Sequence, residues 1–172
     1  MKSIFIRCGM NRLFLHIKNK QMKPFGSTVD FTRQRNADLM RVFRQKLVEA
    51  DFIRMDEICR QVAESPSSRF WVSEERAAIV VSAMESGRRL SCMTETKREM
   101  FDEIFRRYKE MRLIRPEDSL LDLVAVIVNQ PAPKFYFTPR TVREFVRRIR
   151  SGYYDRKHNC LEADGFSKGN KG

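Results

Sequence analysis

PAPKFYFTPRTVREFVRRIRSG, residues 131–152, joins an aromatic run to a basic amphipathic helix and decides the fold. The aromatic residues 135–137 favour an extended segment. Thr138 can cap a helix, and Pro139 suits the first helical position because its ring presets φ. Gly152 can adopt the left-handed conformation that ends a helix. The apolar residues between these signals share one helix face, with spacing i, i+3, i+4, i+7: Val142, Phe145, Val146 and Ile149.

A similar stretch, PSSRFWVSEERAAIVVSAMESG, lies 65 positions upstream at residues 66–87, without a gap. The 22 aligned pairs include five identities, at Pro66, Phe70, Val81, Ser86 and Gly87. The apolar pattern of residues 55–62 also keeps phase with that of residues 120–127. A phase kept over this length predicts an internal duplication, whereas the alternative is that helix start and stop signals recur by chance.

The periodicity predicts a mainly α protein, a helical bundle of two tandem pseudo-symmetric repeats at about 36–92 and 94–152. Each repeat reads as a long helix, a short helix, a short extended segment and a helix. The expected helices cover 30–51, 55–64, 73–86 and 94–113, a fifth that opens at 116–118, and the last from Pro139 to Gly152. The fifth helix is apolar nearly all round, so we expect it to be the hub of the bundle.

The two aromatic runs, 70–72 and 135–137, are candidates for a minimal two-stranded ribbon between the repeats. We expect Phe70, Trp71, Phe135 and Tyr136 to be largely buried and to stabilise the fold. The alternative role for such aromatic rings is stacking on nucleic-acid bases.

One helical domain is therefore expected over 30–152, between a poorly ordered basic arm at 1–29 and a disordered tail at 153–172. If translation starts at Met22, the first 21 residues are absent. No apolar run approaches a membrane span of about 18 residues, and none forms a secretory signal. A transit peptide stays open.

Positive charge is unevenly distributed along the chain. Of the net +12, residues 1–35 carry +7, residues 36–92 carry 0, residues 93–152 carry +4 and the tail carries +1. Localised positive charge is typical of proteins that bind polyanions. The alternative is a solvated arm that only aids solubility.

The last helix provides the candidate binding residues, which are Arg140, Arg143, Arg147 and Arg150 at spacing i, i+3, i+7, i+10, with Arg148 beside them. The first four align with Glu75, Ala78, Ser82 and Glu85 of the upstream copy. One copy therefore presents arginines where the other is neutral or acidic.

No metal, catalytic or cofactor motif is evident. The four cysteines, at positions 8, 59, 92 and 160, are far apart, and His158 with Cys160 has no second pair to complete a zinc site. The acidic pairs 74–75 and 117–118 fall at expected helix starts, where the helix dipole explains them. Cysteines without a disulfide pattern predict a cytoplasmic protein.

The signatures PSSRFWVSEERA and PAPKFYFTPRTV resemble those of small basic proteins of unknown function in Bacteroidetes genomes, some from mobile or phage-like regions. The resemblance covers roughly residues 36–150. It implies no particular activity.

The leading interpretation is a non-enzymatic nucleic-acid-binding module that uses the arginine-rich last helix and the basic arm. DNA is the first candidate, because an α-helix fits the major groove and arginine contacts phosphate and guanine. The alternative is a protein-interaction or structural accessory protein of a mobile element, with the arginines facing an acidic partner. The oligomeric state stays open.

Overall fold

The computed structural model describes residues 28–88 and 93–154, so the predicted arm and tail lie almost wholly outside it. Within these ranges the chain forms six helices, and the predicted helical bundle is confirmed. The helices are α1 Thr28–Glu49, α2 Met55–Glu64, α3 Glu74–Glu85, α4 Glu95–Ile114, α5 Leu120–Val128 and α6 Pro139–Arg150.

Local signals set several of the helix ends. The side chains of Ser73, Ser119 and Thr138 each accept a hydrogen bond from the backbone N–H three residues later. Gly87 and Gly152 follow α3 and α6 with φ of 68° and 65°, which is the left-handed region that glycine tolerates. The predicted start of the fifth helix at 116–118 is wrong, because Ser119 is the residue that caps α5.

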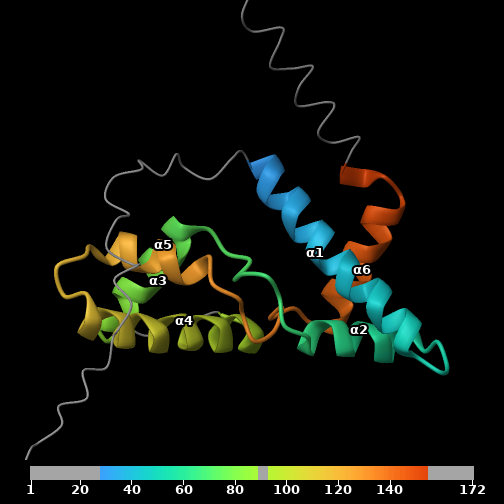
Figure 1. Cartoon of the computed structure of the whole chain (residues 1–172), viewed down its shortest axis with the longest axis horizontal. Helices are drawn as coiled ribbons and strands as arrows, with labels where there is room; N and C mark the ends of the chain where they lie inside the picture. The colour runs from blue at the N-terminus through green and yellow to red at the C-terminus, as the bar shows by residue number, and fades with distance from the viewer. Residues whose placement is uncertain (1–27, 89–92, 155–172) are drawn as a thin grey trace, which may run out of the picture.

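The helices form two groups of three that lie side by side (Figure 1). We call α1, α2 and α6 the split lobe, and α3, α4 and α5 the contiguous lobe. Each lobe has its own hydrophobic core. The expectation that α5 is the hub of the whole bundle is therefore wrong. It packs on α3 and α4, and two of its apolar side chains, Leu121 and Val126, are 50% and 39% exposed.

The third helix of each half packs with the other half of the chain. α1–α2–α3 and α4–α5–α6 have the same order of elements, yet α3 packs on α4 and α5 while α6 packs on α1 and α2. The linkers between second and third helices, residues 65–73 and 129–138, therefore run between the two lobes (Figure 1).

Equivalent hydrogen bonds hold the two linkers, at positions 65 residues apart. Phe70 N–H donates to Val128 O over 3.0 Å, and Phe135 N–H donates to Ala63 O over 3.2 Å. Ser67 and Ala132, themselves 65 positions apart, exchange two backbone hydrogen bonds of 3.1 Å. The element order agrees with the predicted repeats, and their origin by duplication stays a prediction.

The predicted two-stranded ribbon is wrong. The part of the chain that the structure describes contains no strand, only the single antiparallel bridge between Ser67 and Ala132. The aromatic runs begin after this bridge and do not pair, because Phe70 N–H and Phe135 N–H donate to the ends of helices. Tyr136, with φ of 55°, also leaves the extended region.

The linker aromatics divide between the two cores. Phe70 is 1% exposed and stacks on Tyr136, 7% exposed, in the contiguous lobe. Phe135, 1% exposed, belongs to the core of the split lobe. The predicted burial is confirmed for these three side chains. Trp71 is only partly buried and contacts Phe31 edge to face.

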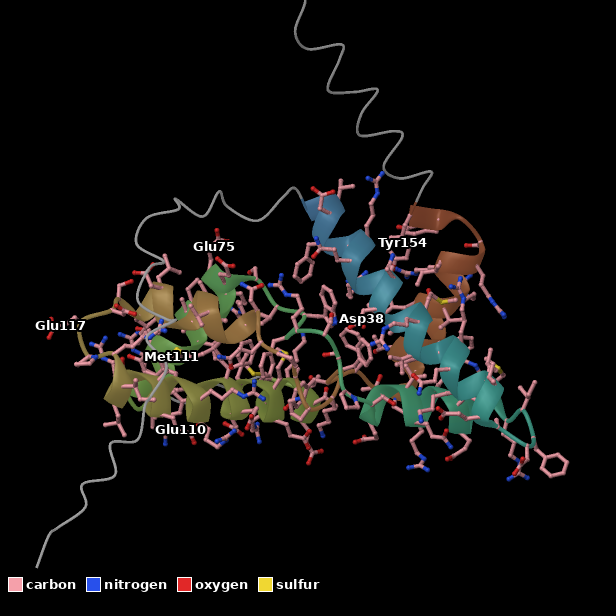
Figure 2. The ribbon with its side chains drawn as sticks, viewed as in Figure 1. Asp38, Glu75, Glu110, Met111, Glu117 and Tyr154 are labelled. Carbon is pink, nitrogen blue, oxygen red and sulfur yellow. The ribbon has the colours of Figure 1, made fainter. Side chains whose placement is uncertain are left out.

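A buried carboxylate fixes the first linker to α1. Asp38 accepts hydrogen bonds of 2.9 Å from both the backbone N–H and the hydroxyl of Ser68, and it pairs with Arg41 at 2.8 Å. Figure 2 shows Asp38 on the side of α1 that faces the linkers. Because hydrogen bonds satisfy both carboxylate oxygens, its burial is tolerated.

Candidate nucleic-acid interface

The outer side of α6 holds all five predicted arginines. The helix buries Val142 and Val146 in the core of the split lobe, where Phe145 and Ile149 pack beside them, so the arginines fall on the remaining, outer side of the helix. Four arginines of this outer face are exposed, namely Arg140, Arg143, Arg147 and Arg150. The fifth, Arg148, is half-buried. The structure thus places the predicted residues together on one solvent-facing surface.

Carboxylates pair with three of these arginines. Arg143 lies 2.9 Å from Asp56 of α2, while Arg147 and Arg148 lie 2.8 and 2.6 Å from Glu144. Hydrogen bonds from Arg147 and Arg148 lower the pKa of Glu144 to about 2, so its carboxylate is charged at neutral pH. Part of the positive charge that the sequence suggests is therefore offset locally.

Arg140 and Arg150, at the two ends of the helix, form no ion pair within residues 28–88 and 93–154. The Arg150 guanidinium lies 5.8 Å from the centre of the Phe43 ring. Arg140 lies in the first turn of α6, which contains no acidic residue. The positive end of the helix dipole therefore adds to the charge of Arg140.

Cation–aromatic contacts hold together α1, α6 and residues 153–154 at one end of the split lobe. Arg35 lies 4.3 Å above Phe145 and 5.9 Å from Tyr154, and Arg148 lies 5.3 Å from Tyr153. Burial lowers the pKa of Arg35. Figure 2 shows Tyr154 between α1 and α6. The packed structure extends at least to Tyr154, two residues beyond the predicted end of the domain.

The equivalent surface of the contiguous lobe differs in character. There α3 and Leu121 of α5 form a shallow groove of about 550 Å³. Its lining residues are Glu75, Ala78, Ile79, Ser82, Ala83, Ser86, Arg88 and Leu121. Shifted by 65 positions, they correspond to Arg140, Arg143, Glu144, Arg147, Arg148, Ser151 and Tyr153, and Leu121 corresponds to Asp56.

The net charge of the helices is also more positive in the split lobe than in the contiguous lobe. The helices of the split lobe hold eleven Lys and Arg residues against seven acids, which gives +4. Those of the contiguous lobe hold seven against nine, which gives −2. Basic side chains therefore gather on one lobe, and the arginines of α6 account for most of that excess.

A second shallow groove, of about 400 Å³, lies along α4 and contains charged residues. Lys134 pairs there with Glu99, and Arg106 pairs with Glu103. Desolvation by burial raises the pKa of the neighbouring Tyr136 to about 12, so the phenol is neutral at pH 7. These ion pairs account for four of the charged residues of the groove in structural terms.

The described ranges contain one cysteine and no histidine. Cys59 is buried, which raises the pKa of its thiol, while the other cysteines and both histidines lie outside those ranges. No cluster of three metal-binding side chains occurs in the part of the chain that the structure describes. None of the helices in that part combines the length and apolar composition that a membrane crossing requires.

Comparison with known proteins adds no relative. No protein-family model, curated protein or solved structure matches the chain. The resemblance to small basic Bacteroidetes proteins stays a prediction.

Proposed function

We propose that the protein is a non-enzymatic nucleic-acid-binding module whose phosphate-binding surface is the outer face of α6. One observation carries the proposal, which is the contrast between two equivalent surfaces of the scaffold. In the contiguous lobe this surface is a neutral groove, whereas in the split lobe the equivalent positions hold four arginines, with Arg150 of the same helix beside them. Packing explains the shared apolar positions of α3 and α6, but it does not explain this difference in charge.

The geometry suits phosphate contacts along the length of the helix. Ten residues separate Arg140 from Arg150, which corresponds to about 15 Å along a helix axis. Within the described residues no carboxylate pairs with these two guanidinium groups, so neither gives up an ion pair there when it binds phosphate. Arg143 and Arg147 would exchange an exposed carboxylate for a phosphate, and exposed ion pairs are weak enough to allow this.

The basic N-terminal segment supports the same assignment. Residues 1–27 hold six Lys and Arg residues and no acid. They precede α1, which belongs to the split lobe together with α6. Both sources of positive charge are thus attached to one lobe, and sequence-independent contacts to the phosphate backbone are the interaction that such charge favours.

The double substitution Arg143→Gln with Arg147→Gln tests the surface directly. It should weaken binding to mixed-sequence duplex and flatten the plot of log affinity against log salt by up to about two units, one per phosphate contact. Folding should persist, because both side chains are exposed. Fluorescence polarisation at several salt concentrations, with both DNA and RNA, measures the effect.

Ser82→Gln in α3 is the matched control, because Ser82 is equivalent to Arg147 in the contiguous lobe. It should leave affinity and slope as in the wild type. If the double variant binds DNA and RNA like the wild type, α6 is not the binding surface. If the wild type binds neither at low salt, an acidic protein partner becomes the leading interpretation.

Glu144→Gln should have the opposite effect. It removes the carboxylate that pairs with both Arg147 and Arg148, so two guanidinium groups become available to phosphate. We expect tighter binding at low salt and a salt dependence steeper by up to about two units. Exposed ion pairs contribute little to stability, so the melting temperature should change little.

Glu110→Gln is the control for overall charge. It changes the net charge by the same amount, but Glu110 lies on α4 of the contiguous lobe (Figure 2). There it pairs with Arg106. Tighter binding by Glu144→Gln alone assigns the effect to α6. Equal tightening by both variants would mean that net charge, and not this surface, governs the interaction.

A further inference from the structure

The groove of the contiguous lobe exposes apolar side chains that its own fold does not use. Ile79 of α3 is 61% exposed and Leu121 of α5 is 50% exposed, and both line the groove. Between and beside them lie small residues of α3 and of its C-cap, Ala78, Ser82 and Ser86, at spacing i, i+4, i+8. Small residues in such a row allow another helix to approach closely.

We propose that this groove is a self-association surface, on which two copies of the chain pack α3 against α3 antiparallel about a twofold axis. The charges at the two ends of the groove are the reason for proposing a second copy of the chain as the partner. Glu75 lines the groove at the start of α3 and Arg88 lines it just beyond the end of the helix. In an antiparallel pair, Glu75 of one copy faces Arg88 of the partner subunit, and this happens twice.

The same arrangement places the small residues at the centre. The midpoint between positions 75 and 88 falls next to Ser82, so the two helices would cross where the side chains are shortest. Ile79 and Leu121 would then flank the crossing point and lose their exposure to water, which favours association. A twofold contact requires one surface that is complementary to itself, and the acid and the base at opposite ends satisfy this condition.

The other lobe explains why assembly would stop at two copies. Its equivalent surface carries four arginines, and like charges facing each other across a twofold axis repel. Only the contiguous lobe can therefore pair with itself, and the contact closes as a dimer instead of growing into a filament. Nucleic-acid binding through α6 uses the opposite lobe, so neither activity depends on the other.

Sedimentation velocity of the full chain, freed of nucleic acid by nuclease treatment, measures the association over a range of concentrations. We expect a monomer–dimer equilibrium. Ile79→Lys should raise the dimer dissociation constant at least about tenfold, because it buries a charge beside the crossing point of the two helices. Leu113→Lys is the control, since Leu113 is 85% exposed at the end of α4 and does not line the groove.

A charge exchange tests the antiparallel geometry. Glu75→Arg and Arg88→Glu should each be monomeric alone, because each places like charges together at both ends of the groove. Mixed in equal amounts, they should form a heterodimer in which each end charge again faces an opposite charge.

A wild type that stays monomeric at every concentration overturns the proposal. The proposal is also overturned if Ile79→Lys leaves the dimer intact, or if the mixture of Glu75→Arg and Arg88→Glu fails to associate. Unchanged DNA binding by Ile79→Lys keeps this test separate from the proposed function.

Discussion

Removal of α6 is expected to unfold α1 and α2, which lie far upstream in the chain, and to leave α3, α4 and α5 folded. In a chain that ends at Phe137, the split lobe loses Val142 and Val146 from its core, and α1 and α2 alone cannot cover their apolar faces. The contiguous lobe keeps its three helices and the Ser67–Ala132 bridge. Circular dichroism should show a large loss of helix.

Hydrogen exchange read by mass spectrometry locates that loss. Amides of residues 28–64 should exchange as in an unfolded chain, whereas those of α4 and α5 should stay protected. A chain that ends at Tyr154 is the control and should retain protection in both lobes. If the chain that ends at Phe137 instead loses protection in α4 and α5, then α6 packs on those two helices. In that case the packing of α6 on α1 and α2 would be incorrect.

Phe135→Ala and Phe70→Ala are expected to destabilise different lobes by similar amounts. Each ring is 1% exposed, and truncation of a buried phenylalanine to alanine costs about 3–5 kcal/mol. Phe135 belongs to the core of the split lobe and Phe70 to that of the contiguous lobe. Chemical denaturation gives the loss of unfolding free energy, and hydrogen exchange assigns it to a lobe.

Phe52→Ala provides the matched control for ring removal. Phe52 is 86% exposed between α1 and α2, so its truncation should change the unfolding free energy by less than about 0.5 kcal/mol. The Phe135 variant should also bind nucleic acid normally at temperatures where it is folded. Unchanged stability together with lost binding would instead assign Phe135 to base stacking.

Elements that depend on local signals could be predicted from the sequence. The bounds of α2 agree with the prediction, and α3 and α6 begin directly after the predicted caps Ser73 and Thr138. Caps and helix-ending glycines act within a few residues of themselves, so they are visible without the fold. The outward position of the α6 arginines followed equally from the spacing of its apolar residues.

Features that depend on which segments meet could not be predicted. The apolar composition of α5 does not reveal whether it serves one core or two, and the hub prediction failed for that reason. The pairing of Arg143 with Asp56 joins α6 to α2 across 87 positions of sequence, so only the packing of the third helix shows it. The electrostatics of the candidate surface therefore needed the fold.

The split lobe is built from helices at both ends of the chain, so the two lobes can fold only in a set order during synthesis. The contiguous lobe has all its helices once Val128 has emerged, so it can fold while synthesis continues. α1 and α2 emerge first but must wait for α6, whose last residue lies 86 positions beyond the end of α2. At translation rates of about 5–20 residues per second, this delay lasts about 4–17 s. During that interval the nascent chain exposes Leu39, Phe43 and Ile58 without the cover of α6, and exposed apolar side chains are the kind of surface that chaperones bind.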